Sequence, residues 1–444
     1  MAVDYVYRVE QPHVPGQLAT LCQRIAEAGG LIGDIVTVTI GRERSIREVS
    51  VEVRDHGQAK RVAGMLSQLD DVRVLSYWDR ALRAHEGGKL AMEVIAKVET
   101  LQDMRDVYTP GVARVCMAIA EDPALAHRYT MIGRTVAICT NGTRVLGLGN
   151  IGPVASAPVM EGKALFYRQM VGVSAVPILI DTEDADEFVD TVIRIAPGFG
   201  AIHLEDIRVP ECFEIEPRLI EALDVPVMHD DVHGTAVATL GAALVACANA
   251  NLALEHAVVG QIGLGAAGLG IATLMVEAGA SRVVASDPDE RSHARARERG
   301  IEIGSFEDVM AGAQIVVATT GQPGLIEPDH IRDGQVILAL TNPDPEISPL
   351  VAERAGAAFA ADGSMVNNVL GFPGIFRGAL SVGADRISTG MKLAAARAIA
   401  AITAESELVP DALDPQVHAE VASAVAEAAR SEGIARPERV PAGL

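Results

Sequence analysis

The chain has 444 residues, 49% of them hydrophobic and 22% charged, a globular composition whose length favours two or three domains over one core. Its formal net charge of −22 argues against a nucleic-acid partner and against docking on an anionic membrane, because both need a basic surface. The five cysteines are scattered and include no CxxC pair, so neither a disulfide framework nor a structural zinc site is indicated.

Residues 1–82 are expected to form a separate domain with the element order βαββαβ, a small split α/β sandwich. Alternation predicts its strands and helical spacing its helices, in the order YVYRVE, LATLCQRIAEAGG, DIVTVTI, REVSVEVR, QAKRVAGMLSQL and VRVLSYW. With VPGQLATLCQRIAEAGG as first turn and helix, this segment resembles the ACT regulatory module. That resemblance implies paired modules that bind a small effector, and the alternative is a module that only drives dimerisation.

Two further α/β domains are expected, over residues 83–232 and 233–444. The polar segment RAHEGGK opens the first of them. In the second, predicted strands alternate with predicted helices, which indicates a doubly wound, Rossmann-type parallel sheet followed by C-terminal helices.

The uncharged segment 235–254 is long enough to cross a membrane. Asn249 and Asn251 interrupt it and a glycine-rich turn follows, so a buried helix that leads into a buried strand is favoured. The N-terminus is charged where a signal peptide needs an apolar run. We therefore expect a soluble, cytoplasmic protein.

The dinucleotide fingerprint GxGxxG occurs twice, as GLGNIG (147–152) and GLGAAG (263–268). The fingerprint needs a preceding strand, a helix whose N-terminus meets the pyrophosphate, and an acidic residue about 20 positions on for the ribose. The second copy has all three, whereas prolines follow the first copy at once and no acid ends a strand at that distance. GLGNIG is therefore interpreted as a substrate-side loop. The dinucleotide is predicted to bind at Gly263, Gly265, Gly268 and Asp287.

Two acidic pairs follow apolar, strand-like stretches: Glu205 and Asp206 in HLEDI, and Asp230 and Asp231 in VMHDDVHGTA. Carboxylates that converge from two strand ends repel one another unless a cation lies among them. Ligand sets made only of oxygen suit Mg²⁺ or Mn²⁺. The sequence therefore predicts a site for one of these ions.

The histidines near these pairs offer a rival metal, zinc. His229 and His233 are four residues apart, as the two histidines of a zinc-binding helix are. That pairing needs a helix, whereas VPVMHDDVHG is predicted to be a strand and a turn, so zinc is disfavoured. His203 is interpreted as a core or surface residue.

Seven motifs together resemble the malic enzyme family, in the family's order and over nearly the whole chain from about residue 83. They are VYTPGVARVC, TRVLGLGNIGP, VMEGKALF, HLEDI with CFEIE, HDDVHGTA, TNPDPEIS and VNNVLGFPGIFRGAL. The resemblance implies oxidative decarboxylation of L-malate to pyruvate and CO₂ with NAD⁺ or NADP⁺ and a divalent metal. A homodimer or higher homo-oligomer is expected, and the sequence leaves open whether a second subunit completes the active site.

The same motifs imply roles for individual residues. In catalysis, Lys163 would be the general base, Tyr108 the general acid, and Asp230 the neighbour that tunes Lys163. The implied ligands of the metal are Glu205, Asp206 and Asp231. The implied malate-binding residues are Arg144, Asn342 and Asn368, with Asn342 also on the nicotinamide side.

These residue types suit the reaction. Hydride leaves C2 of malate only if the C2 hydroxyl is deprotonated, and a lysine can take that proton only if its pKa falls towards neutrality. Burial and a nearby cation are expected to lower the pKa of Lys163. The cation would hold the C2 oxygen while CO₂ leaves, and a tyrosine hydroxyl would deliver a proton to C3.

Two features depart from the family pattern: Val232 stands where a polar residue is common, and the segment after Asp287, DPDERSHARARERG, is unlike the usual cofactor loop. A carboxylate at Asp287 favours NAD⁺ over NADP⁺, although Arg291 and Arg295 follow closely and could meet a 2′-phosphate.

Two alternative functions remain: an amino-acid dehydrogenase, which needs no metal ligands, and a non-catalytic effector sensor.

Overall fold

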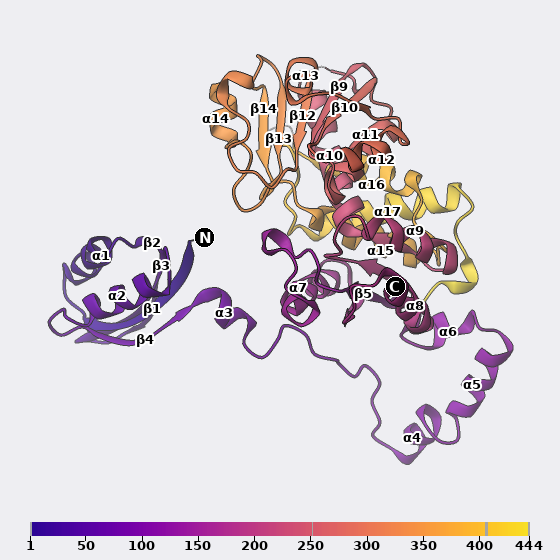
Figure 1. Cartoon of the computed structure of the whole chain (residues 1–444). Coiled ribbons are helices and arrows are strands. Elements are labelled where there is room, and N and C mark those ends of the chain that lie inside the picture. Colours follow the sequence, from indigo (N-terminus) through magenta and orange to yellow (C-terminus); the bar gives the residue numbers. More distant parts are fainter. Residues whose placement is uncertain (1, 251, 405–406, 443–444) are drawn as a thin grey trace. The chain divides into compact units, whose positions relative to one another are not determined.

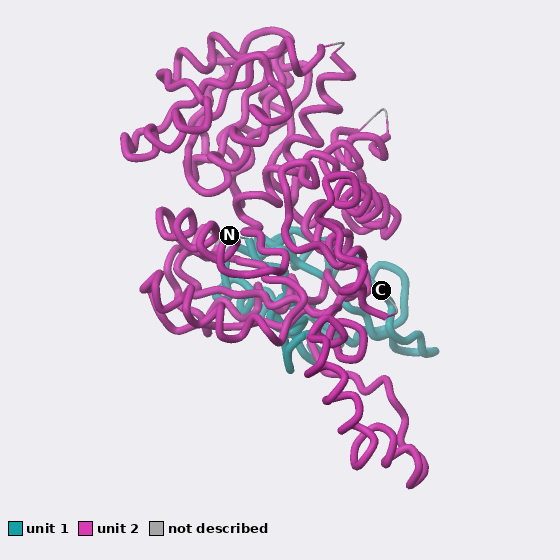
Figure 2. Tube along the Cα trace, turned by 90° about the vertical axis from the view of Figure 1, so that its right-hand side faces the viewer, with its two compact units in different colours: residues 1–89 teal, residues 90–444 magenta. Residues whose placement is uncertain are grey.

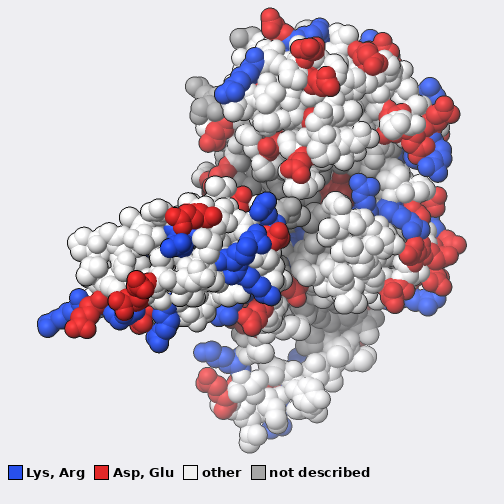
Figure 3. Space-filling model, turned by 60° about the vertical axis from the view of Figure 1, so that its left-hand side comes forward, with Lys and Arg blue, Asp and Glu red and all other residues white. Residues whose placement is uncertain are grey.

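The computed structural model describes residues 2–250, 252–404 and 407–442 (Figure 1). The chain divides into two compact units, residues 1–89 and 90–444, which Figure 2 colours separately. The division falls at the end of the polar segment RAHEGGK. On the face drawn in Figure 3, basic side chains lie close to acidic ones.

Unit 1 is a four-stranded antiparallel sheet with helices packed on it, in the predicted order. Its elements are β1 (Val3–Pro12), α1 (Gln17–Glu27), β2 (Leu31–Ile40), β3 (Arg44–Val53), α2 (His56–Leu66), β4 (Arg73–Asp79) and α3 (Arg80–His85). The strand order is β2-β3-β1-β4, and Tyr7 of the central strand β1 pairs with Val49 of β3 and Tyr77 of β4. Alternate residues of β1 and β3 are buried against α1 and α2, which gives unit 1 a core of its own.

The edge strand of unit 1, β2, is exposed at every residue, on both faces of the sheet. It pairs with β3 and ends the strand order, so its outer edge is unpaired within unit 1. Leu31 and Ile40 at its two ends are each 67% exposed, and four more apolar side chains between them are exposed as well: Ile32, Ile35, Val36 and Val38. A long apolar edge of this kind is a template for pairing with another strand.

Unit 2 begins with an exposed segment. It carries the helices α4 (Leu101–Val107) and α5 (Val112–Glu121), and we call residues 90–121 the arm. The arm extends away from the rest of unit 2 in both views of the chain (Figures 1 and 2), and neither helix contains a buried residue. Its apolar side chains are widely exposed, among them Met92, Val94, Ile95, Leu101 and Met117. A contiguous exposed apolar segment marks a candidate protein interface.

The first sheet of unit 2 is parallel and four-stranded. Its elements follow helix α6 (Leu125–Tyr129) and are β5 (Thr135–Thr140), α7 (Pro153–Val171), β6 (Ser174–Leu179), α8 (Ala185–Ile195), β7 (Ala201–Leu204), α9 (Cys212–Ala222) and β8 (Val227–His229). The strand order is β6-β5-β7-β8, and β5 is buried throughout, as a parallel strand covered on both faces should be. Leu204 of β7 pairs with His229 of β8, so the residues that follow these two strands meet.

The second sheet of unit 2 is the predicted doubly wound parallel sheet. Its elements are β9 (Val258–Ile262), α11 (Ala266–Glu277), β10 (Arg282–Ser286), α12 (Glu290–Arg297), β11 (Glu302–Ile303), α13 (Phe306–Gly312), β12 (Ile315–Ala318), β13 (Val336–Ala339), α14 (Pro349–Arg354) and β14 (Phe359–Asp362). The strand order is β11-β10-β9-β12-β13-β14, so the chain builds the sheet outward from β9 first on one side and then on the other. Ligands bind at such switch points in open α/β sheets. The chain then forms α15 (Phe372–Ser381), α16 (Thr389–Ile402) and α17 (Pro415–Ser431), the predicted C-terminal helices.

A long helix, α10 (Asp230–Asn249), links the two sheets and spans the predicted domain boundary between residues 232 and 233. Among the described residues it is the one helix long and apolar enough to cross a membrane, and 72% of its apolar window is buried inside the fold. It contributes to the same core cluster as α11 and α16. The uncharged segment as far as Asn249 therefore belongs to a core helix of unit 2, and Asn251 lies outside the described residues.

Candidate active site

Four carboxylates meet at the carboxyl ends of β7 and β8. Glu205 and Asp206 follow β7, and Asp230 and Asp231 form the first turn of α10 directly after β8. One oxygen from each of Glu205, Asp206 and Asp231 lies within 4.8 Å of the others. The structure thus brings together the two acidic pairs that the sequence singles out.

Backbone geometry holds this cluster in place. Asp206 has a φ of 56°, a left-handed conformation that aspartate tolerates better than most residues. Its backbone N–H donates to Asp231 Oδ2 over 2.9 Å, and its carbonyl accepts from the backbone N–H of Arg144 over 3.0 Å. Asp230 and Asp231 lie at the N-terminus of α10, where the helix dipole favours negative charge. Three chain segments are therefore tied into one site.

Lys163 reaches the cluster from α7 and is only 8% exposed. Its ammonium contacts Asp230 Oδ2 and lies 3.0 Å from Glu205 Oε1 and 4.6 Å from the centre of the Phe372 ring. Burial lowers the pKa of Lys163, but the charges of Asp230, Glu205 and Asp231 outweigh burial, and the net result is a raised pKa. Burial thus acts in the expected direction, but the carboxylates outweigh it, so the expected lowering of the pKa of Lys163 depends on the cation that would offset their charge.

The carboxylates carry more negative charge than Lys163 balances. Burial, opposed by Lys163 and assisted by Asp231, raises the pKa of Glu205 to about 8. Burial, opposed by Lys163 and assisted by Glu205, raises the pKa of Asp230 to about 6. A divalent cation would offset this charge, and Glu205, Asp206 and Asp231 offer the carboxylate oxygens that Mg²⁺ and Mn²⁺ prefer. The residues at the site therefore fit such a cation.

Two buried side chains that the sequence analysis left without a site role support the cluster. His203 on β7 directs Nε2 to Glu205 Oε2 over 2.7 Å and Nδ1 to the Tyr167 hydroxyl over 2.9 Å. Burial lowers the pKa of His203 to about 4, so the neutral ring donates from one nitrogen and accepts at the other in its bonds to Glu205 and Tyr167. Glu205, directly after β7, is two residues from His203, and Lys163 and Tyr167 are four apart on α7. These spacings put the two residues of each pair on one face of their element, and they were the sequence signal from which a role for His203 and Tyr167 could have been inferred.

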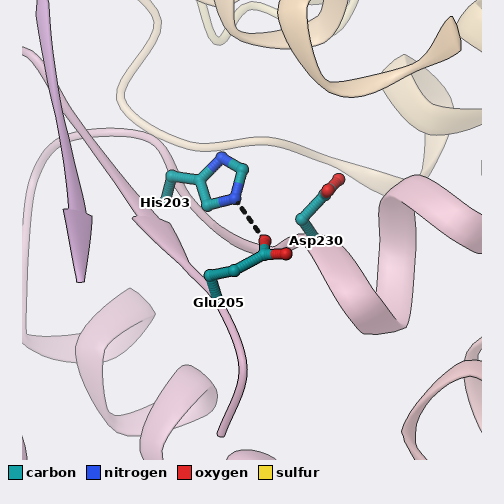
Figure 4. Close-up of side chains that lie close together, drawn as sticks. All are labelled: His203, Glu205 and Asp230. Carbon is teal, nitrogen blue, oxygen red and sulfur yellow. Dashed lines mark hydrogen bonds and ion pairs between the residues drawn. The ribbon is translucent and has the colours of Figure 1, made fainter. Parts of the chain in front are cut away.

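His203, Glu205 and Asp230 form a second group whose ligand atoms lie within 4.8 Å of one another (Figure 4). A cation there would have to displace existing contacts, because Asp230 contacts Lys163 and both nitrogens of His203 have partners. The all-oxygen group of Glu205, Asp206 and Asp231 demands no such change at Asp230 or His203. The all-oxygen group is therefore the better candidate for a cation.

Gly234 of HDDVHG leaves room for the side chain of Asp230. A Cβ at this position would lie 1.8 Å from Asp230 Oδ1 and 3.4 Å from the Cβ of Asn368. The carboxylate of Asp230 can therefore fold over the first turn of α10 and meet Lys163. Asn368, at the start of a short 3-10 helix (Asn368–Leu370), lies beside the same turn.

Arg144 and Asn342 lie on loops. Arg144 is exposed, and its backbone bond to Asp206 places it next to the acidic turn. Asn342 follows β13, and its Nδ2 donates to the carbonyl of Gly363 over 3.2 Å. A Cβ on Gly147 would lie 3.9 Å from the carbonyl oxygen of Asn342. The GLGNIG loop therefore approaches the loop after β13.

The GLGNIG loop also precedes a helix, which the prolines after it had argued against. Pro153 occupies the first turn of α7, a position where its missing N–H costs nothing, and Pro158 lies inside the helix. Because α7 carries Lys163, this fingerprint leads into the acidic cluster. Its interpretation as a substrate-side loop agrees with that position.

The GLGAAG turn joins β9 to α11, and each of its glycines has a distinct steric role. Gly263 has a φ of 90°, and a Cβ there would lie 2.7 Å from the carbonyl oxygen of Thr319. A Cβ on Gly265 would meet only open space, which lets a diphosphate approach the backbone. A Cβ on Gly268 would lie 2.0 Å from the carbonyl oxygen of Gly263. This is the steric pattern of a dinucleotide-binding turn.

Asp287 follows β10 and faces the same turn, where its Oδ2 accepts a backbone N–H over 2.6 Å. The two nearby arginines have other partners. Arg291 Nε donates to Asp289 Oδ1 over 2.9 Å, and the guanidinium of Arg295 lies 5.3 Å from the centre of the Phe213 ring. The surroundings of Asp287 therefore suit a ribose hydroxyl better than a 2′-phosphate.

Tyr108 is the predicted site residue that the structure does not bring to the cluster. It ends α4 and is 68% exposed. The arm that carries it extends away from α7 and β5 (Figure 1). The described chain therefore assembles the predicted base and metal ligands but leaves the predicted general acid outside.

His229 and His233 flank the first turn of α10, so the segment is helical from Asp230 and the argument that disfavoured a zinc pair is wrong. The two rings nevertheless have different surroundings. His233 Nε2 lies 2.9 Å from Glu216 Oε2, and its Nδ1 lies 3.1 Å from Lys392 Nζ. His229 is fully buried, with Nδ1 3.8 Å from Asp231 Oδ2. In the part of the chain that the structure describes, no metal-binding group contains both rings.

Comparison with known proteins identifies two family models that match this chain. The family described as "Malic enzyme, N-terminal domain" matches residues 88–220, and "Malic enzyme, NAD binding domain" matches residues 353–432. "NAD-dependent malic enzyme 1" of Bacillus subtilis is 50% identical over 95% of this chain and 96% of its own length. "NAD-dependent malic enzyme" of Geobacillus stearothermophilus is 40% identical over 94% and 93%. The crystal structure of malic enzyme from Pyrococcus horikoshii matches with a TM-score of 0.76 and 38% identity, over 80% and 91%.

Proposed function

The chain belongs to the malic enzyme family, and we propose that it catalyses the oxidative decarboxylation of L-malate to pyruvate and CO₂ with NAD⁺ and a divalent cation. The observation that carries this proposal is the insertion of Lys163 into a cluster of four carboxylates. The dinucleotide helix α11 packs against the start of α10, the helix that carries Asp230 and Asp231, because a Cβ on Gly270 would lie 2.1 Å from the carbonyl oxygen of Val232.

In this proposal each group at the site has a binding role. Glu205, Asp206 and Asp231 hold the cation, and Arg144, Asn342 and Asn368 bind malate. When bound, the cation would polarise the C2 oxygen and offset the charge that develops as CO₂ leaves. The dinucleotide would supply the hydride acceptor. It is held by Gly263, Gly265, Gly268 and Asp287, with Asn342 on its nicotinamide side.

Proton transfer falls to Lys163 and Tyr108. Offsetting the charge of Glu205 and Asp231 removes two of the causes that raise the pKa of Lys163 against burial, which favours transfer of the C2 hydroxyl proton to its amine. Asp230 holds Nζ in position through its contact with the ammonium. Tyr108 then supplies the proton that C3 needs after CO₂ has left.

The position of the arm supports a homo-oligomer in which Tyr108 acts in the site of a second copy. Tyr108 is exposed and lies on an arm whose apolar side chains its own chain leaves uncovered. A second copy is the partner that offers both an apolar surface to cover the arm and a cluster that lacks a general acid. Isologous pairing would satisfy both copies at once.

A coupled assay tests the activity directly. Purified protein is incubated with L-malate and NAD⁺, with and without Mn²⁺, while NADH absorbance and pyruvate are followed. We expect equal amounts of NADH and pyruvate, no turnover after EDTA treatment, and recovery on addition of Mn²⁺. Malate oxidation that survives EDTA would contradict the metal role, and glutamate or leucine oxidation without metal would favour an amino-acid dehydrogenase.

We expect NAD⁺ to be preferred over NADP⁺, because Asp287 can accept from the ribose 2′-hydroxyl and repels a 2′-phosphate. Asp287→Ser should lower kcat/KM for NAD⁺ by about tenfold, as loss of a charge-assisted hydrogen bond does, and should not lower kcat/KM for NADP⁺. Steady-state kinetics with both dinucleotides measures this. A higher kcat/KM with NADP⁺ in the unaltered protein would mean that Arg291 or Arg295 turns towards the phosphate.

We propose a regulatory role for unit 1. Residues 2–89, which the structure describes, hold no acidic cluster like that of unit 2, and the bare apolar edge β2 is suited to antiparallel pairing with β2 of a second copy. The backbone N–H groups after Val14, Pro15 and Gly16 at the start of α1 would face a carboxylate-bearing effector.

Deleting residues 1–82 should remove any effector response and keep basal malate oxidation, because unit 1 has its own core. The measurement is malate KM and melting temperature against a panel of amino acids and carboxylic acids. An effector should change malate affinity through a coupling of about 1–3 kcal/mol. If no compound shifts either quantity in the full chain, unit 1 serves only to pair the chains.

A further inference from the structure

Three polar side chains form a hydrogen-bonded row behind the acidic cluster, and each comes from a different helix. Glu216 lies on α9, His233 on α10 and Lys392 on α16. Lys392 Nζ is 3.1 Å from His233 Nδ1, and His233 Nε2 is 2.9 Å from Glu216 Oε2. Glu216 is only 8% exposed, and its other oxygen, Oε1, accepts the backbone N–H of His229 over 2.8 Å.

The donors and acceptors fix the direction of this row. The ammonium of Lys392 can only donate, so His233 Nδ1 is the acceptor and the ring proton lies on Nε2. Nε2 therefore donates to Glu216. Glu216 has two donors, His233 and the backbone of His229, and a carboxylate is the one side-chain group that accepts at both oxygens and donates at neither.

Glu216 thus forms hydrogen bonds to both ends of the segment HDDVH. It holds the backbone at His229, the last residue of β8, and the side chain of His233, four residues later. Asp230 and Asp231 lie between these two anchor points. Lys392 fixes the ring of His233 in turn, so a residue of the C-terminal helix α16 acts on the position of both aspartates.

We propose that Glu216, His233 and Lys392 are positioning residues that hold the first turn of α10 so that Asp231 meets the divalent cation. The inference rests on the proposed cation site and goes beyond it, because none of the three residues touches the cation or malate. Partners that orient metal ligands in this way are worth about 10–100-fold in metal affinity. In this proposal the three residues belong to the metal site, although they lie behind the carboxylates that bind the cation.

Lys392→Met is the most informative variant, because it removes the donor to His233 and keeps the length of the side chain. The row borders a cavity of about 120 Å³ between α9, α10, α11 and α16, which gives an altered side chain room without overpacking. We expect the Kd for Mn²⁺, measured by isothermal titration of the full chain without malate or dinucleotide, to rise about tenfold. Glu216→Gln should act similarly, because its amide N–H₂ would face the N–H of His233.

Two controls separate the possible outcomes. Arg397→Met removes a positive charge from the exposed side of the same helix and should leave the Kd unchanged. Asp231→Ala removes a proposed ligand and should weaken Mn²⁺ binding more than Lys392→Met does. An unaltered chain that does not bind Mn²⁺ would overturn the proposed metal site, and the positioning role with it. The other outcome is that the unaltered chain binds Mn²⁺ and that Lys392→Met and Glu216→Gln bind it with the same Kd and differ only in a lower melting temperature. This outcome would overturn the positioning role alone.

Discussion

Lys163→Ala is expected to lower kcat for malate oxidation by about 10²–10⁴-fold, the range for loss of a positioned base. Dinucleotide affinity should stay unchanged, because the GLGAAG turn and Asp287 are separate from Lys163 in the fold. Mn²⁺ binding should be retained, since removal of an ammonium from among carboxylates favours a cation in its place. Steady-state kinetics, dinucleotide titration and Mn²⁺ titration on one preparation measure all three quantities.

Lys163→Arg is the control that separates catalysis from charge balance. Alanine leaves Asp230 and Glu205 buried without their counter-charge, which by itself destabilises the fold. Arginine keeps a positive charge between these carboxylates, but a guanidinium does not lose its proton in the accessible pH range. Turnover should therefore be lost in both variants, whereas the melting temperature should fall further with alanine. Turnover of Lys163→Arg close to that of the unaltered chain would exclude Lys163 as the base.

The acidic cluster could be predicted from the sequence because its geometry follows from sheet topology. Residues after neighbouring parallel strands meet at one edge of the sheet, so the apolar runs before Glu205 and Asp230 were enough to place both pairs together. The glycines of GLGAAG were equally informative, since each position meets a different steric requirement. In both cases local pattern and three-dimensional position are tied by the backbone itself.

What could not be predicted depends on side chains that meet across the fold. Glu216 and Lys392 are 176 positions apart, yet both contact His233, and no local spacing reveals such a meeting. The pKa of Lys163 is another case, because its direction depends on the balance between burial and three carboxylates. The start of α10 was placed too late, since HDDVHG contains turn-forming residues and the tertiary contacts of Glu216 decide the matter.

Tyr108 poses the remaining question, and mixing two inactive chains is expected to restore activity. One chain carries Tyr108→Phe and the other Lys163→Arg, each with its own affinity tag, and the mixed assembly is isolated through both tags. If Tyr108 acts in the site of the partner, the chain with intact Lys163 receives Tyr108 from the other chain. Each pair then has one active site. Activity should then approach half that of the unaltered protein per pair.

If the arm instead folds back on its own chain, every site in this mixture has one defect and the activity stays as low as in either parent. The reciprocal mixture must give the opposite result. An unaltered chain is paired with one that carries both Tyr108→Phe and Lys163→Arg. If Tyr108 acts in the partner's site, both sites are inactive. If Tyr108 acts in the site of its own chain, one site stays active. The pair of mixtures therefore decides which chain supplies Tyr108, because loss of stability would lower both and could not reverse their order. Exchange of arms between two copies would also account for an exposed tyrosine on an uncovered apolar segment.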